Sequence, residues 1–267
     1  MAPLVTLLSD FGPAGPYVGS VRGVLLARCP GVVLADITHD VPPQDVLAGA
    51  FVLRAAYPWF PAGTVHLAVV DPGVGGPRRA IVARTAEHAF VGPDNGLFTL
   101  LYDAGVHDVF EIDPARLGLD PARISPTFHG RDLFAPAAAR LAEGDDPAAF
   151  GTPVTDPVRL PLAAPARRDA WLRTPVLYVD TFGNVATALT PEILERLVPG
   201  GRGAAALDLP GPWTGTVLAR TFAAGPHGRP FLLWGSSGYL EVVADRQRAD
   251  RLLGVKAGEE LTFAVRG

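Results

Sequence analysis

The sequence predicts an α/β N-terminal domain with a central, mostly parallel sheet, followed by a small all-β C-terminal domain. In the first part, apolar runs alternate with helical patterns, and in the last part many short strands are separated by Gly and Pro. Between them the composition changes to Pro, Ala and Arg without a sustained period, which is typical of an ordered linker. We therefore place the domains at residues 1–155 and 174–267, with the linker at 156–173.

The N-terminal domain is expected to alternate strands and helices along the chain. The strand candidates are Leu4–Leu8, Val32–Ile37, Thr64–Val70, Ala80–Arg84, His88–Val91 and Asp108–Ile112. The helix candidates are Ser20–Cys29, Asp45–Ala56, Asn95–Asp103 and Arg131–Glu143. Pro30-Gly31 stops the first helix and Gly144 the last, in which Pro136 is expected to bend the helix or delay its start.

The C-terminal domain is expected to be a small barrel or sandwich, because its apolar runs are short and bounded by Gly and Pro. The strand candidates are Val176–Val179, Val185–Leu189, Ala204–Leu207, Thr216–Phe222, Phe231–Trp234, Tyr239–Val243 and Leu261–Val265. Short helices are expected near Pro191–Leu197 and Ala249–Leu253.

Composition and charge exclude several classes of protein. The chain has 267 residues, 48% of them apolar and 19% charged, which describes a folded protein with its own core. Its net charge of −4, without a basic run, makes nucleic acid a poor partner. The first apolar run ends at Asp10 and prolines interrupt residues 55–70, so we expect neither a targeting segment nor a membrane span. The single cysteine, Cys29, cannot form an internal disulfide, which favours the cytoplasm.

Common motifs of α/β enzymes do not occur in the sequence. The segment GSSGY at 235–239 lacks the G-x-S-x-G spacing of a nucleophile elbow, and no G-x-x-x-x-G-K-[ST] is present. GVGGPR at 73–78 has Pro77 and Arg78 where a dinucleotide fingerprint needs its helix and last glycine. His39-Asp40 lacks the partner spacing of a metal site, so no metal is expected.

Polar residues stand instead where predicted strands end, which is where open α/β sheets bind ligands. Asp10 follows the first strand among glycines, and its carboxylate could bind two ribose hydroxyls or only cap the local turn. Asp71 follows another strand, and a Gly/Pro turn could return Arg78 or Arg79 to it, as a structural ion pair or as part of a site. His129 precedes a helix, where the dipole favours its neutral form; alone, such a residue is more often structural than catalytic.

Seven segments, taken in order, resemble the S-adenosylmethionine hydroxide adenosyltransferase family, which is related to the fluorinase and chlorinase enzymes. They are SDFG, THDVPPQD, VVDPGVGGPRR, VGPDNGL, TFHGRDLFAPAAA, VDTFGNV and GSSGYLEV, and together they run along nearly the whole chain. The resemblance implies an α/β N-terminal domain and a β-barrel C-terminal domain. It also implies a homotrimer that binds S-adenosyl-L-methionine between the N-terminal domain of one subunit and the C-terminal domain of the next. The implied reaction needs no cofactor: water or hydroxide attacks the ribose C5′ and releases adenosine and L-methionine.

The resemblance also implies residue roles. The catalytic residues are Asp71, Arg78 and His129, which favours Arg78 over Arg79. The substrate-binding residues are Asp10 for the ribose, Asp180 for the methionine ammonium, Asn184 and Phe222 for the adenine, and Ser236 for the amino-acid end. Ala188 and the segment Arg246–Arg248 depart from the family pattern and affect the expected substrate contacts rather than the chemistry.

Two other functions compete with hydrolysis. A halide-using relative is opposed by Asp71, whose charge would repel an anion, and by Gly130, which replaces the serine that holds fluoride in the fluorinating enzyme. A non-catalytic S-adenosylmethionine or adenosine sensor would not need Asp71, Arg78 and His129 together. For hydrolysis, Asp71 could accept the proton of the attacking water, or it could orient water and His129 while Arg78 holds the developing hydroxide.

Overall fold

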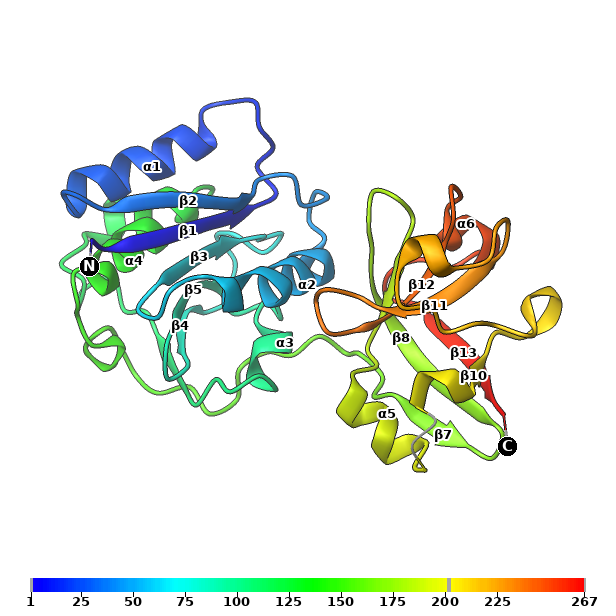
Figure 1. Ribbon diagram of the computed structural model, residues 1–267. Coiled ribbons are helices and arrows are strands. Elements are labelled where there is room, and N and C mark those ends of the chain that lie inside the picture. Colours follow the sequence, from blue (N-terminus) through cyan, green and yellow to red (C-terminus); the bar gives the residue numbers. More distant parts are fainter. Residues whose placement is uncertain (1, 201–202, 267) are drawn as a thin grey trace. The chain divides into compact units, whose positions relative to one another are not determined.

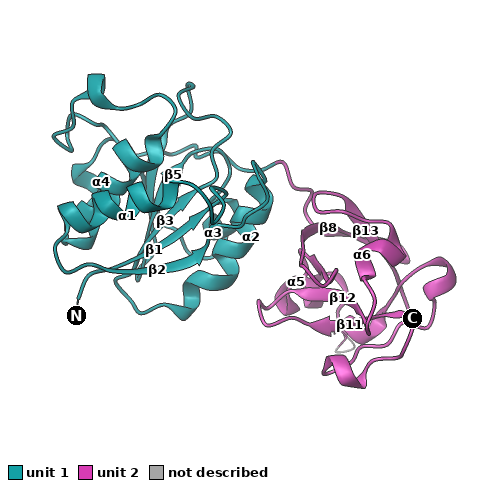
Figure 2. Cartoon of the chain, turned by 90° about the horizontal axis from the view of Figure 1, so that it is seen from above, with its two compact units in different colours: residues 1–160 teal, residues 161–267 magenta. Residues whose placement is uncertain are grey.

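The computed structural model describes residues 2–200 and 203–266, and the chain divides into two compact units, Met1–Leu160 and Pro161–Gly267 (Figure 2). The first unit contains the strands β1 (Leu4–Ser9), β2 (Val33–Thr38), β3 (Val65–Val69), β4 (Ala80–Arg84), β5 (Ala89–Pro93) and β6 (Asp108–Glu111). Its helices are α1 (Tyr17–Arg28), α2 (Val46–Ala56), α3 (Thr99–Tyr102) and α4 (Ala135–Ala142), with the short helical turns η1 (Tyr57–Trp59), η2 (Pro121–Arg123), η3 (Gly130–Phe134) and η4 (Pro147–Ala149).

The strands of the first unit form one mixed sheet in the order β2-β1-β3-β5-β4-β6 (Figure 1). β2, β1, β3 and β5 pair in parallel, whereas β4 pairs antiparallel with both β5 and β6. The carboxyl ends of the four parallel strands therefore lie along one edge. This confirms a mixed α/β sheet with parallel strands in the N-terminal region.

Helices cover both faces of this sheet. Side chains of α1 and α4 share a core with one face, in which Val5, Leu67 and Cys29 are almost completely buried. On the other face α2 lies so close that a Cβ at Gly49 would come within 3.0 Å of Val70 and 2.9 Å of Leu97. The strands β1, β3 and β5 are thus buried on both sides, whereas β2 at the edge of the sheet is partly exposed.

The helix predicted over Arg131–Glu143 begins differently in the structure. Gly130–Phe134 forms the π-helical turn η3, and the α-helix α4 covers only Ala135–Ala142. Pro136 has no N–H to give the carbonyl four residues earlier, and its ring would crowd that carbonyl in an α-helix. A wider turn before Pro136 avoids this crowding, and it sets the backbone immediately after His129.

The second unit is built on a curled antiparallel sheet. Its strands are β7 (Ala166–Arg168), β8 (Trp171–Val179), β9 (Val185–Thr187), β10 (Leu207–Asp208), β11 (Pro230–Trp234), β12 (Leu240–Ala244) and β13 (Glu260–Val265). Its helices are α5 (Pro191–Leu197) and α6 (Ala249–Leu253), with the turns η5 (Gly203–Ala206), η6 (Gly211–Trp213) and η7 (Phe222–Ala224). The strand order β10-β13-β8-β9-β12-β11, with β7 beside β8, is a path with two free ends. Among the described residues no ladder joins β10 to β11, so the expected barrel is not closed.

β8 curls the second sheet. Its first half pairs with β13 and its second half with β9, and the register shifts between Val176 and Tyr178. Such a shift bends a strand, so one β8 serves two parts of the sheet. The concave side buries Leu172, Val185, Leu232 and Phe263.

Two strands predicted for this unit, at 204–207 and 216–222, do not form as expected. Gly203–Ala206 is a helical turn and only Leu207–Asp208 is extended. At 216–222 a single bridge pairs Leu218 with Leu232. The Asp208 carboxylate accepts the amides of Gly215 and Thr216, so these amides are satisfied by a side chain instead of a ladder.

Residues 156–173, expected as a linker, begin without helix or strand and carry strands in their later part. The Val158 amide donates to Asp94 Oδ1 at 2.8 Å, within the first unit. β7 and the start of β8 occupy the later part and pair antiparallel. Among the described residues no helix is long and apolar enough to cross a membrane.

Candidate active site

Four parallel strands deliver polar side chains to the carboxyl edge of the first sheet. Asp10 follows β1, His39 follows β2, Asp71 comes after β3, and Asp94 follows β5. Ser9 lies opposite Val69 in the β1–β3 ladder, so Asp10 and Asp71 leave the sheet from neighbouring strands. This edge is where open α/β sheets place ligands.

Asp71, Arg78 and His129 come together in the structure. Arg78 Nε donates to Asp71 Oδ1 at 3.0 Å and Nη2 donates to Asp71 Oδ2, which makes the contact bidentate. The same Nη2 lies 2.9 Å from Nδ1 of His129. The side chains of Asp71 and Arg78 are only 5% and 10% exposed, so the ion pair is shielded from water. One guanidinium thus joins a carboxylate and an imidazole that are far apart in the sequence.

Close backbone packing brings these three residues together. Gly75 has a φ of +75° and lies so near Pro126 that a Cβ would be 2.3 Å from its carbonyl oxygen. Only glycine fits at this position. Because it has no side chain, the turn after Asp71 can pack on the loop that leads to His129. Asn95 Nδ2 also donates to the Val70 carbonyl at 2.8 Å, which fixes the backbone beside Asp71.

Arg79, the alternative partner for Asp71, binds elsewhere. Its Nε donates to Asp94 Oδ2 at 2.7 Å, and its Nη1 donates to Asp156 Oδ1 at 2.7 Å. Asp94 is 3% exposed and also accepts the Val158 amide. Arg79 therefore ties residues 156–158 to the end of β5, and Arg78 remains as the partner of Asp71.

The surroundings of His129 keep its ring neutral. Burial and the charge of Arg78 lower the pKa of His129, against opposing effects of Asp71 and Asp132. Because a guanidinium can only donate, Nδ1 accepts from Arg78 and the ring proton is placed on Nε2. His129 can thus offer an Nε2–H donor to a ligand atom.

Aromatic side chains surround this polar group. Phe11, Tyr17 and Phe128 form a cluster with ring centroids 5.3–5.9 Å apart, and the Arg78 guanidinium lies 5.2 Å from the ring of Phe134. A Cβ at Gly130 would lie 3.2 Å from Phe11 and 3.4 Å from Phe128. Sequence reasoning missed this wall, although Phe11 and Phe128 stand inside the SDFG and TFHG segments, because contacts between distant rings leave no local pattern.

Asp10 is held from one side only. Its Oδ2 accepts the Gln44 amide at 2.8 Å. Gln44 has a φ of 65°, a backbone conformation uncommon for a residue with a side chain. Within residues 2–200 and 203–266, Oδ1 has no hydrogen-bond partner, so it is free to bind a hydroxyl.

In the second unit, Asp180 and Asn184 form one turn between β8 and β9. Asp180 Oδ1 accepts the amides of Phe182 and Asn184, and Oδ2 accepts from Asn184 Nδ2 at 2.8 Å. Arg248, from the segment that departs from the family pattern, donates to the Thr181 carbonyl at 2.9 Å and pairs with Asp250. Arg248, which differs from the family pattern, therefore packs on the turn that contains Asp180 and Asn184.

A partly buried carboxyl group lies near this turn. Burial and the charge of Asp180 raise the pKa of Glu241, on β12, to about 7. Its Oε1 would be 1.9 Å from a Cβ at Gly235, so a side chain at residue 235 would displace the carboxyl group of Glu241. Ser236 follows Gly235 in the exposed turn between β11 and β12, and Phe222 begins η7 with 52% of its surface exposed.

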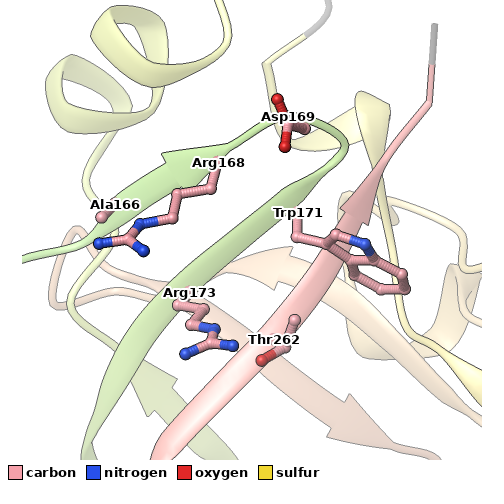
Figure 3. Close-up of a pocket in the computed structure, with 6 residues that line it drawn as sticks. All are labelled: Ala166, Arg168, Asp169, Trp171, Arg173 and Thr262. Carbon is pink, nitrogen blue, oxygen red and sulfur yellow. The ribbon is translucent and has the colours of Figure 1, made fainter.

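A cavity of about 410 Å³ lies on the outer face of β7, β8 and β13, and it contains none of the predicted site residues (Figure 3). It is lined by Ala166, Arg168, Asp169, Trp171, Arg173 and Thr262. As for metals, the described residues contain no group of three His, Cys, Asp or Glu side chains placed to hold an ion.

The polar edge of the first sheet and the separate antiparallel unit define a class of two-unit α/β proteins with a small-molecule site. The description "SAM hydroxide adenosyltransferase N-terminal domain" matches residues 5–151, and that of the C-terminal domain matches residues 174–262, where SAM is S-adenosylmethionine. The chain belongs to the SAM hydroxide adenosyltransferase family.

Individual relatives extend along nearly the whole chain. A protein of Thermus thermophilus named (R)-S-adenosyl-L-methionine hydrolase is 41% identical over 95% of this chain and 96% of its own length. A fluorinase of an Actinoplanes species is 28% identical over 97% of both chains. The crystal structure of an uncharacterized conserved protein from Thermotoga maritima superposes with a TM-score of 0.86 at 32% identity, covering 97% of this chain and 99% of that one.

Proposed function

We propose that this protein hydrolyses S-adenosyl-L-methionine to adenosine and L-methionine. The observation that carries the proposal is the buried Asp71–Arg78–His129 group in a chain 41% identical, along nearly its full length, to a protein named as such a hydrolase. In the reaction, the oxygen of water bonds to the ribose C5′ and the C5′–sulfur bond breaks. Sulfur keeps the electron pair and becomes the neutral thioether of methionine, and one proton of the water is released.

Asp71, Arg78 and His129 act on the water in this proposal. A sulfonium is already a good leaving group, so the enzyme has to align and activate the nucleophile and need not protonate sulfur. Arg78 and the Nε2–H of neutral His129 supply donors for the developing hydroxide. Both oxygens of Asp71 accept hydrogen bonds from Arg78. This arrangement favours a role for Asp71 in orienting Arg78, His129 and the water, and it disfavours a role as the proton acceptor.

The substrate is bound by residues of both units in this proposal. Asp10 binds the ribose hydroxyls, Asp180 the methionine ammonium, Asn184 and Phe222 the adenine, and Ser236 the amino-acid end. The free Oδ1 of Asp10 supports its role. We further propose a homotrimer in which one subunit contributes the first set of contacts and its neighbour the second. We propose no cofactor or metal, and the cytoplasm as the compartment, on the single cysteine of the sequence.

Two observations favour hydrolysis over halide transfer. The Asp71 carboxylate is 5% exposed, so its charge acts through little water and opposes a halide nearby. At residue 130 the rings of Phe11 and Phe128 leave no room for a side chain unless they shift. A serine hydroxyl that could hold fluoride is absent here, and a serine at this position would have to displace the ring of Phe11.

Incubation of the purified protein with S-adenosyl-L-methionine tests the proposal. Both sulfonium epimers are supplied separately, because the Thermus relative is named for the (R) form. Chromatography should show adenosine and methionine in equal amounts, from the (R) epimer in excess, and undiminished product with a chelator present. An intact substrate after long incubation with folded protein would contradict the function.

A further inference from the structure

Behind Asp10 lies a chain of polar contacts that the proposed chemistry does not use. Ser9 Oγ lies 2.7 Å from His39 Nδ1, and His39 Nε2 lies 3.2 Å from Asp36 Oδ1. Asp36 also pairs with Arg22 of α1. The chain thus runs from α1 through β2 to the end of β1, one residue before Asp10.

The carboxylate beside His39 favours one direction for the donors and acceptors of this chain. Ser9 Oγ accepts the Phe11 amide at 3.3 Å, and the Ser9 hydroxyl proton is available to His39 Nδ1 when that nitrogen is unprotonated. His39 Nε2 lies 3.2 Å from Asp36 Oδ1 without an aligned hydrogen bond, and the charge of this carboxylate favours the imidazole proton on Nε2, with Nδ1 as the acceptor. Arg22 and His39 lower the pKa of Asp36 more than burial raises it, so Asp36 stays ionised and holds this tautomer.

The backbone of His39 binds the same loop. Its carbonyl accepts the Gly12 amide at 2.8 Å, and the Val41 amide donates to the Ser9 carbonyl at 3.4 Å. The side chain of His39 therefore binds Ser9, before Asp10, and its backbone carbonyl binds Gly12, after Asp10. The following residue, Phe11, is the ring that lies against Gly130, next to His129.

We propose that His39 is a positioning residue, which through Ser9 fixes the loop 9–12 so that Asp10 points at the ribose of the substrate. The inference rests on the proposed function, since it names what sets the geometry of the ribose contact. The pairing of β1 with β2 brings Ser9 and His39 together, and the His39–Asp36 contact sets which nitrogen Ser9 meets.

The Ser9–His39–Asp36 arrangement is not a nucleophilic triad. Ser9 is 2% exposed, and its oxygen already accepts a backbone amide. No substrate carbon can reach it without unpacking the strand. Its surroundings suit a fixed hydrogen bond and not attack on a substrate.

The test is a set of variants at His39 and Ser9, assayed with S-adenosyl-L-methionine. His39→Ala should raise KM about tenfold while kcat changes less than about threefold, because the ribose contact of a misplaced Asp10 is lost. His39→Asn retains an acceptor near the position of Nδ1 and should recover much of the affinity. The double variant Ser9→Ala/His39→Ala should be no worse than His39→Ala alone, because both residues act in one chain.

The control and the contrary outcomes separate positioning from general destabilisation. Asp40→Asn changes the neighbouring residue of the same loop and should leave KM unchanged. An unchanged KM in His39→Ala, or additive effects of Ser9→Ala and His39→Ala, would overturn the inference. If the wild-type chain fails to hydrolyse the substrate, the proposed function falls, and amide exchange then decides the inference. Phe11 and Gly12 should exchange faster in His39→Ala; unchanged exchange at these amides would overturn it.

Discussion

Arg78 and Arg79 are adjacent in the sequence but bind different carboxylates. Arg78 joins Asp71 to His129, and Arg79 joins Asp94 to Asp156. Sequence spacing predicted that one of them would meet Asp71 but could not choose between them, because a Gly/Pro turn fixes no side-chain direction. The choice depends on the long-range partners, and these appear only in the fold.

The two arginines allow a matched comparison. Arg78→Ala should lower kcat/KM by about 10²–10³, because it removes donors from the developing hydroxide and from His129. Arg79→Ala should keep kcat within about threefold but lower the free energy of unfolding by about 2 kcal/mol, because it leaves the buried Asp94 carboxylate without its cation. Steady-state assays and denaturant titrations measure both. Equal losses of activity in the two variants would contradict the assignment of Arg78.

Asp71→Asn distinguishes the two roles open to Asp71. If Asp71 accepts the proton, turnover should fall by about 10²–10⁴ with nearly unchanged substrate affinity. If Asp71 instead orients the water and His129 and excludes halide, the variant should retain slow hydrolysis and yield a trace of chlorinated nucleoside when chloride is added. We expect a large loss with only such a trace. Product analysis with and without chloride measures this, and hydrolysis near the wild-type rate would remove Asp71 from the site.

His66 makes the first unit sensitive to acid. It is fully buried, with Nδ1 2.7 Å from Thr6 Oγ1 and Nε2 3.4 Å from His88 Nδ1. Burial and His88 lower the pKa of His66 from 6.5 to about 3. Between these values the unfolded chain binds a proton that the folded chain does not, so stability is lost as pH falls below 6.5, by about 1.4 kcal/mol per pH unit.

His66→Gln cannot be protonated and should weaken this dependence. Between pH 7 and pH 5, the wild type should lose about 2 kcal/mol more of its unfolding free energy than the variant loses. Urea titrations at the two pH values measure the difference. Equal pH dependence in both proteins would show that His66 is not the responsible group.

Among the elements, the π-helical turn η3 shows what periodicity cannot predict. Apolar spacing and Gly144 predicted a helix here, and Pro136 indicated an altered start. The wider turn itself and the ring contacts at Gly130 arise from packing on Phe11, which is remote in sequence. The strands β1, β3 and β5 were predictable because burial on both faces makes them continuous apolar runs. The segments at 204–207 and 216–222 were not, because residues 203–206 form a helical turn and the Asp208 carboxylate accepts the Thr216 amide in place of a ladder.

Gly130→Ala and Gly23→Ala form a matched pair of helix substitutions. At Gly130 a Cβ would lie 3.2 Å from Phe11, so alanine should displace the aromatic wall and lower kcat/KM about tenfold or more. At Gly23, within α1, a Cβ meets nothing within 4 Å, so alanine should add up to about 1 kcal/mol of stability and leave activity unchanged. Thermal melts and assays of both variants test this. Full activity in Gly130→Ala would show that the rings adjust freely.

At the scale of the whole molecule, the proposed site draws on both units. Asp71 belongs to the first unit, and Asn184 to the second. If each site is shared between subunits, mixing inactive Asp71→Asn with inactive Asn184→Ala should restore part of the activity, because some sites then receive two intact halves. Assays after verified subunit exchange measure this. Activity that stays at the level of the separate variants would place the whole site within one chain.

Cys29 is buried in the core between α1 and the sheet, so its reaction with a thiol reagent can measure local opening of the protein. It is 1% exposed, and burial together with Glu143 raises the pKa of its thiol, so the folded protein holds it unreactive. The second unit has no thiol, since the chain has a single cysteine. The rate at which a thiol reagent labels the native protein therefore reports the opening of the first unit alone. Substrate that binds to the first unit should slow this labelling, which turns an unmodified side chain into a reporter of ligand occupancy.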